Sequence, residues 1–136
     1  MTRYWIGVVG AKHAEIGKDR GFCAFSHGKK QAISRQSPGD RFAYYGPREG
    51  YKEGAVVQAF VALGTVLEGD PYEVDFDGNP GWVRPAQTDI FARTPVKPLL
   101  EDLAFVSNPK YWGMAFRRSL FEISAEDYAL IEGAYG

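Results

Sequence analysis

The stretch AVVQAFVALGTVLE, residues 55–68, is the longest apolar run in the chain and decides the expected fold class. It is rich in β-branched residues, and a run of this kind favours a buried strand over a helix. Gly64 lies inside the run, where a glycine is typical of a bulge or bend. We therefore expect a long central strand, with the remaining elements arranged around it.

Shorter strands are predicted on both sides of this segment. In YWIGVV, residues 4–9, both alternating sets of side chains are mostly apolar, which indicates a strand buried on both faces. The further predicted strands cover residues 22–26, 41–46 and 82–97. We expect Gly46-Pro47 to break the second of these, and Pro85 and Pro95 to interrupt the third, because proline cannot donate a ladder hydrogen bond.

The predicted helices are short and few. They cover residues 11–21, 29–36 and 98–105, and a fourth helix ends the chain within residues 121–135. In the last one Ser124 is the expected N-cap, with Asp127 three residues further on. A turn is predicted at residues 37–40, a loop at 108–118, and a polar, solvated hairpin at 68–81 that carries Glu68, Asp70, Glu73, Asp75 and Asp77. Because strands outnumber helices, we expect residues 1–136 to form one α+β domain with a strongly curved or barrelled sheet.

Composition limits the function. A charged share of 24% is ordinary for a globular protein, and the net charge of −1 disfavours a protein that coats nucleic acid by charge alone. Aromatic residues make up 15%, a share that suits a β-rich core or a surface that stacks flat ligands. No apolar run approaches the roughly 20 residues of a membrane helix. The single cysteine and the lack of a signal-peptide pattern at the start predict a cytoplasmic location.

Catalytic chemistry is not predicted. Cys23 and His27 are four residues apart, which spans ~13 Å on a strand and is too far for a thiolate–imidazolium pair. The two histidines and one cysteine have no zinc-binding spacing, and phosphate-binding loop motifs are missing. We therefore expect no catalytic residue, no metal and no cofactor.

Positive charge is concentrated in residues 23–45, CAFSHGKKQAISRQSPGDRFAYY. Ser26 to Lys29 lie where a predicted strand passes into a predicted helix, and free N–H groups at a helix start attract phosphate. Gly28 would allow close approach of a ligand, while Lys29 and Lys30 would add charge and His27 could bond to a base edge. The alternative is that His27 bonds to a local carbonyl and the lysines are solvated.

Several stretches in order resemble the EVE domain family, a PUA-like family related to the YTH readers of methylated adenine. They are YWIGVV, GFCAFSHGKKQAI, SPGDRFAYYGPR, PVKPLLEDLAFV, YWGMAFRRSLFEIS and EDYALI, between Tyr4 and Ile131. The resemblance implies a PUA-like mixed β-barrel with short flanking helices and a pocket for a single, often modified, nucleobase. In place of the two adjacent arginines common in relatives, this chain has Trp82-Val83-Arg84-Pro85, and so keeps only Arg84.

The resemblance also suggests the site residues. For base binding we name Phe25 and Trp82 as walls, with Ser26, His27, Tyr45 and Trp5 as further candidates. For phosphate binding we name Gly28, Lys29, Lys30, Arg84 and Arg117. For Trp5 and Trp112 the alternative is core packing, and for Arg117 and Arg118 it is a surface ion pair. Tyr44 and Tyr45 point to opposite faces of their strand, so at most one of them can line the pocket.

The sequence therefore predicts a non-catalytic reader that binds DNA or RNA with a modified base, as a monomer or weak dimer and without membrane contact. Two alternatives stay open. The same concave surface could hold a peptide or partner domain, or it could belong to an enzyme that acts on a small nucleotide.

Overall fold

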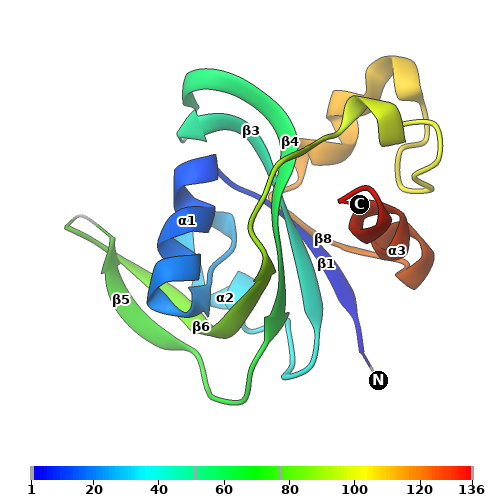
Figure 1. Ribbon diagram of the computed structural model, residues 1–136. Helices are drawn as coiled ribbons and strands as arrows, with labels where there is room; N and C mark the ends of the chain where they lie inside the picture. The colour runs from blue at the N-terminus through cyan, green and yellow to red at the C-terminus, as the bar shows by residue number, and fades with distance from the viewer. Residues whose placement is uncertain (1, 51, 77, 136) are drawn as a thin grey trace.

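The computed structural model describes residues 2–50, 52–76 and 78–135. Within these residues the strands form one strongly curled, mixed sheet in the order β2-β6-β4-β3-β1-β8, with β5 paired to β6 and β7 paired to β4 (Figure 1). The strands are β1 (Tyr4–Val8), β2 (Phe22–Cys23), β3 (Arg41–Gly50), β4 (Glu53–Val66), β5 (Tyr72–Phe76), β6 (Asn79–Ile90), β7 (Thr94–Pro95) and β8 (Leu120–Ile123). The expected α+β class with a PUA-like, barrelled sheet is confirmed.

The central strand is β4, as the apolar run predicts. It pairs with β3 on one side and with β6 on the other, both antiparallel. The register with β6 shifts between Leu63 and Gly64, so the expected irregularity at Gly64 is confirmed. A Cβ atom at Gly64 would collide with the ring of Phe42 and lie 2.7 Å from the carbonyl oxygen of Gln87. Glycine is needed there because two neighbouring elements approach the backbone closely.

Strand β3 is longer than predicted. It continues through Gly46 and Pro47 to Gly50, so the expected break is wrong. The reason is local register: Gly46 pairs with Ala59 and Arg48 with Val56, and Pro47 falls in the irregular step between the two pairs. Strand β6 likewise runs on through Pro85, which pairs with Phe22. Because β3 and β4 are both long, their hairpin continues past the rest of the sheet and curls over at the top of Figure 1.

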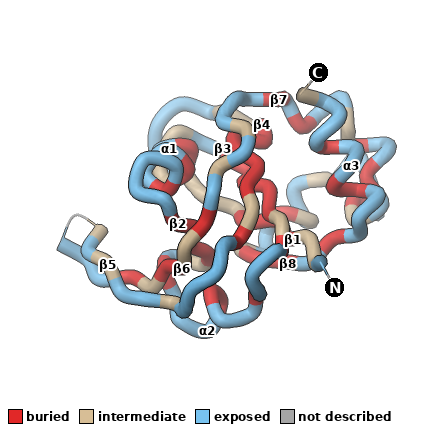
Figure 2. Tube along the Cα trace, turned by 60° about the horizontal axis from the view of Figure 1, so that its bottom comes forward, coloured by how far each residue is buried: buried red, intermediate tan, exposed pale blue. Residues whose placement is uncertain are grey.

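Both faces of the sheet are buried, as the pattern of residues 4–9 predicts. Trp5 and Tyr44 belong to one hydrophobic cluster, while Ile6 and Tyr45 belong to a second cluster on the other face. Figure 2 shows that the buried residues follow the central strands, whereas α1, α3 and the loops carry most of the exposed ones. The predicted opposite orientation of Tyr44 and Tyr45 is confirmed.

Helices cover the two sides of the sheet: α1 (Ala11–Arg20), α2 (Lys30–Ile33) and α3 (Ala125–Gly133). Helix α1 ends at Gly21, whose φ of 76° is left-handed. The hydroxyl of Ser124 caps α3 by accepting a hydrogen bond from the Asp127 amide at 3.1 Å. Helix α2 is a single turn, shorter than the expected 29–36, and residues 120–123 form β8, which the sequence analysis missed. None of the described helices is long and apolar enough to cross a membrane.

The segment between β7 and β8 is organised differently from the prediction. The helix expected at 98–105 is only a 3₁₀ turn, η2 (Lys97–Leu99), and the loop expected at 108–118 is a 3₁₀ helix, η3 (Pro109–Arg117). Asp127, buried at the start of α3, accepts hydrogen bonds from the amides of Ala104 at 2.9 Å and Phe105 at 3.1 Å. These bonds hold the loop before η3 against the body of the protein.

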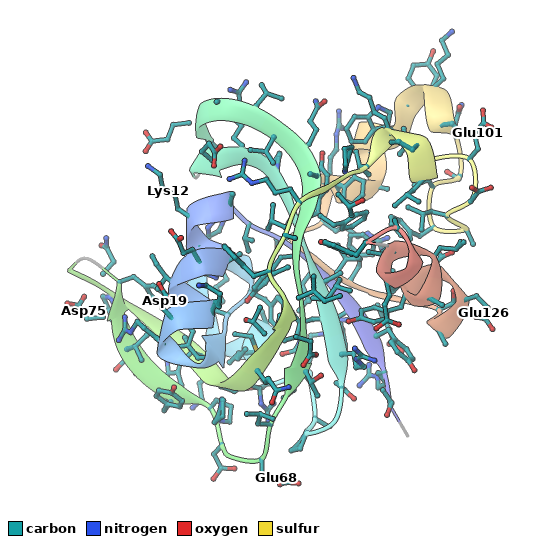
Figure 3. The ribbon with its side chains drawn as sticks, in the orientation of Figure 1. Lys12, Asp19, Glu68, Asp75, Glu101 and Glu126 are labelled. Carbon is teal, nitrogen blue, oxygen red and sulfur yellow. The ribbon has the colours of Figure 1, made fainter. Side chains whose placement is uncertain are left out.

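The polar segment after β4 forms the predicted hairpin, β5–β6. Glu68, Asp70, Glu73 and Asp75 are exposed, and Asp77 lies outside the described residues. In Figure 3, Glu68 is at the bottom and Asp75 at the left, both away from the curled β3–β4 hairpin at the top.

Candidate functional site: a basic cleft at the end of β1

A cleft with a volume of about 510 Å³ opens among the described residues. Four parts of the chain form it: the end of β1 with Val8, Val9 and Gly10, the turn at His27, the curled part of β3 and its hairpin, and the segment from Phe116 to Ser119. We call it the main cleft. It brings together segments that are more than one hundred residues apart in sequence, since Val8 and Ser119 both line it.

The floor of the main cleft is apolar. Val8, Val9 and Pro47 line it together with Phe116. The ring of Phe116 is stacked on that of Tyr45, with 4.0 Å between centroids and 22° between planes. Tyr45 is only 2% exposed and therefore supports the floor from below. Burial raises the pKa of Tyr45 to about 12, so its hydroxyl stays neutral at physiological pH.

The rim of the main cleft is basic. Arg48, Lys52, Arg117 and His27 line it, and no described lining residue carries a carboxylate. Arg48 is held in place by a hydrogen bond that it donates to the carbonyl of Gly54 at 2.9 Å. A neutral flat floor beside several positive groups is a suitable environment for a heterocycle joined to a phosphate.

An unusual turn carries His27 to the rim. Ser26, His27 and Gly28 have φ angles of 51°, 61° and 76°, so three consecutive residues are left-handed. Such a conformation costs about 1–3 kcal/mol for each non-glycine residue and persists only where the surroundings impose it. Two contacts do so here: Gly28 packs on β6, and the hydroxyls of Ser26 and Ser119 lie 2.5 Å apart. Strain of this kind is concentrated at functional sites in proteins.

Two of the predicted site residues, His27 and Arg117, line the main cleft. Ser26 lies directly behind it, bonded to the lining residue Ser119. Tyr45 lies beneath the floor. The exposed residues Lys29 and Lys30 do not line the cleft, and neither does the half-buried Trp82, over whose ring the ammonium of Lys30 lies at 4.6 Å.

Phe25 and Trp5 require correction as base-stacking residues. Both side chains are 0% exposed, so neither presents a ring face to a ligand. Phe25 is enclosed by the rings of Phe42 and Tyr44. Trp5 donates its indole N–H to the carboxylate of Asp40 at 3.0 Å. These two aromatic residues are part of the core.

The phosphate role of Arg84 requires correction too. Its guanidinium is buried and donates hydrogen bonds to the carbonyls of Ile33 and Gln36, at the end of α2, and to that of Gly69. Arg84 therefore supplies hydrogen-bond donors to backbone carbonyls that lack a helical N–H partner, and its guanidinium cannot reach a ligand. Gly28 is also structural, because a Cβ there would lie 2.8 Å from the Cα of Gly81. Helix α2 is too short to attract phosphate through a helix dipole.

Cys23 and His13 do not line the main cleft. Cys23 is buried, and burial raises the pKa of its thiol to about 12, which keeps the sulfur protonated and unreactive. Burial also lowers the pKa of His13, which packs between Tyr44 and Phe76. Among the described residues no group of three or more His, Cys, Asp or Glu side chains could hold a metal ion.

Comparison with known proteins decides the family. The family model of the EVE domain matches residues 3–134, nearly the whole chain. This chain belongs to the EVE domain family. The EVE domain is also 38% identical over 141 residues to a UPF0310 protein of Mesorhizobium japonicum, with 100% of this chain and 93% of the relative covered. A UPF0310 protein of Renibacterium salmoninarum is 34% identical over 134 residues, which cover 98% and 96% of the two chains.

Solved structures share the fold of this EVE domain. The crystal structure of protein Atu2648 from Agrobacterium tumefaciens matches with a TM-score of 0.60 and 16% identity, covering 98% of this chain and 93% of the other. The NMR structure of Rpa0253 from Rhodopseudomonas palustris matches with a TM-score of 0.58 and 17% identity, covering 98% and 92%. At these identities the likeness concerns the fold alone.

Sequence reasoning missed most residues of the main cleft in this EVE domain. The sequence predicts Val8 and Val9 only as strand residues and places the end of a strand at Pro47. Arg48 and Lys52 lie in the hairpin beyond that expected break, where the sequence predicts no site. The available signal was the pair of cations on either side of Gly50 in a segment flanked by two predicted strands.

Proposed function

We propose that this EVE domain is a non-catalytic reader of nucleic acid that takes one unstacked nucleobase into the main cleft. The base lies on the apolar floor made by Val8, Val9, Pro47 and Phe116, and the adjoining phosphate lies against Arg48, Lys52 and Arg117. The observation that carries the proposal is the combination of an apolar floor with a basic rim whose described residues include no carboxylate. A site for a metal cation would instead require negatively charged oxygen ligands on its rim.

The size of the main cleft suits this ligand. Its volume of about 510 Å³ lies within the range of roughly 300–1,000 Å³ that is typical of small-molecule sites. Extruding a base from a duplex costs a few kcal/mol. Burial of apolar surface against the floor returns about 25 cal/mol for each Å² removed from water, and each charge-assisted hydrogen bond to phosphate adds about 1.5–3 kcal/mol. The expected affinity is therefore moderate, and it is highest where the base is already unpaired.

Preference for a modified base would be limited by the same magnitudes. Burying one additional methyl group is worth ~0.8 kcal/mol, which is roughly fourfold in affinity. A hydroxymethyl group that forms one new hydrogen bond adds about 0.5–1.5 kcal/mol. We therefore expect graded preference among methylated and hydroxymethylated bases rather than absolute selection.

A titration of short oligonucleotides tests the proposed function. Fluorescence anisotropy would measure dissociation constants for a panel with an unmodified, methylated or hydroxymethylated base at one central position, in DNA and in RNA. We expect roughly a fourfold preference or more for one modification, with a log–log salt slope near −2 to −3 on duplex DNA from two or three phosphate contacts. Absence of binding to the entire panel at low salt would refute the proposal. Turnover of a nucleotide would show that the protein is an enzyme and not a reader.

A further inference from the structure

A second cleft lies next to the main cleft. It has a volume of about 280 Å³ and is formed by the loop that contains Phe105 and by helix η3 with Tyr111, Trp112 and Met114. Arg117 lines the main cleft, and the next residue, Arg118, lines the second cleft. The ring of Phe116, which floors the main cleft, lies 6.0 Å from Trp112 and 5.7 Å from Phe105. The two clefts therefore have a common wall.

Large apolar side chains are exposed at the second cleft. Tyr111 is 56% exposed and Met114 is 63% exposed, which are among the highest values for large apolar side chains in the described residues. Both lie in η3, which has a kink at Tyr111, and the amide of Lys110 at its start donates a hydrogen bond to the side chain of Asn108 at 3.0 Å. The loop on the other side of the cleft is held by Asp127, which accepts hydrogen bonds from the amides of Ala104 and Phe105. The exposed ring of Tyr111 therefore faces a loop that is anchored to α3.

Two cations lie at the second cleft: Arg118 lines it, and Lys110 lies beside the lining residue Tyr111. The ammonium of Lys110 lies 5.5 Å from the ring centre of Tyr111, and the guanidinium of Arg118 lies 4.4 Å from that of Phe121. No acidic residue is among the described residues that line the second cleft. Phe121 is buried, so Tyr111 is the exposed ring of these two. An exposed ring with cations nearby is the arrangement with which proteins bind single-stranded nucleic acid, because rings stack on bases and cations follow the backbone.

We propose that the second cleft stacks the base that follows the one in the main cleft, so that the EVE domain binds two consecutive nucleotides of an unpaired strand. Tyr111 provides the stacking surface, and the phosphate between the two nucleotides lies against Arg117 and Arg118. The inference rests on the proposed function of the main cleft. It adds the class of ligand, because a base that remains paired within a duplex cannot lie on Tyr111.

Charge and continuity favour nucleic acid over another occupant. A nucleic acid strand can pass directly from the main cleft to the second cleft, and its phosphates complement the basic residues of both. A second copy of this chain would bring a net charge of only −1, whereas each nucleotide of a strand brings one phosphate charge. Self-association through Tyr111 is nevertheless an outcome that the experiment can reveal.

The test compares two probes with three proteins. The probes are thymidine 5′-monophosphate and a single-stranded oligodeoxythymidylate of about eight nucleotides, a length within the usual site sizes. The proteins are the parent, Tyr111→Ala and Tyr111→Phe, each checked by thermal unfolding. Because Tyr111 is mostly exposed, we expect all three to fold.

We expect Tyr111→Ala to weaken oligonucleotide binding by about fivefold or more and to leave binding of the monophosphate unchanged. Tyr111→Phe keeps the ring and should retain the parent affinity. Equal oligonucleotide affinity of parent and Tyr111→Ala would overturn the inference, and the proposed function would survive if the monophosphate still bound. If the parent bound neither probe, the proposed function would fail as well. Loss of a dimer in Tyr111→Ala, seen by sedimentation, would assign the second cleft to contact between copies and overturn the inference.

Discussion

Asp40→Ala is expected to destabilise the protein by roughly 3 kcal/mol, a large share of the stability of a single domain. The Asp40 carboxylate is 1% exposed and accepts three hydrogen bonds, each at 3.0 Å, from the amides of Arg3 and Ser37 and from the indole of Trp5. Alanine leaves these donors without a partner, and each buried, unsatisfied donor costs about 1–3 kcal/mol. Removal of the buried charge returns part of its desolvation cost, which keeps the expected loss below the sum.

Urea unfolding monitored by tryptophan fluorescence measures this effect, since Trp5 is one of the partners. Asp70→Ala is the matched control, because Asp70 is exposed in the acidic hairpin and its loss should change the free energy of unfolding by less than about 0.5 kcal/mol. The loss of unfolding free energy in Asp40→Asn should lie between those of the other two variants. Its side-chain amide keeps one acceptor oxygen but places an NH₂ donor against the remaining N–H groups. A loss in Asp40→Ala no larger than that of Asp70→Ala would contradict the anchoring role of this carboxylate.

The double variant Arg48→Ala/Arg117→Ala is expected to weaken binding of nucleic acid by roughly 100-fold or more. Each arginine would supply a charge-assisted contact to phosphate worth about 1.5–3 kcal/mol, so two of them give about 3–6 kcal/mol before non-additivity is considered. Both side chains are exposed, and the fold should tolerate their loss. The log–log salt slope should fall by about 1.8 on duplex DNA.

The matched control removes the same charge elsewhere. In Arg20→Ala/Arg35→Ala both arginines are exposed and neither lines the main cleft, although Arg35 belongs to the basic stretch 23–45. This control should keep the affinity of the parent within a few fold. An equal loss in the two double variants would show that net charge, and not the main cleft, determines binding.

Much of the fold could be predicted because alternation along a strand determines which face a side chain occupies. The placement of Tyr44 and Tyr45 in different clusters follows from that rule alone. The continuation of β3 through Pro47 could not be predicted. The missing N–H of this proline is harmless because the pairing of β3 with β4 is irregular at that point, and the position of the irregularity depends on β4. The C-terminal strand β8 was missed because it gains its partner from β1, more than one hundred residues earlier.

The site was only partly predictable, for a related reason. His27 and Arg117 were found because a basic group next to a glycine or an aromatic residue is visible in the sequence. Phe25, Trp5 and Arg84 have the same composition signals, yet contacts distant in sequence bury all three: rings from β3 around Phe25, Asp40 on Trp5, and the carbonyls of α2 on Arg84. The cytoplasmic location, the oligomeric state and the absence of catalysis stay predictions.

Chemical-shift mapping of the ¹⁵N-labelled protein titrated with a nucleoside 5′-monophosphate tests the binding site most directly. We expect the largest shifts at the amides of Val9, Gly10 and Ser119, which line the main cleft, and small shifts at Trp82 and Lys30. Shifts concentrated at Trp82 and Lys30, with those of Val9 and Ser119 unchanged, would contradict the account.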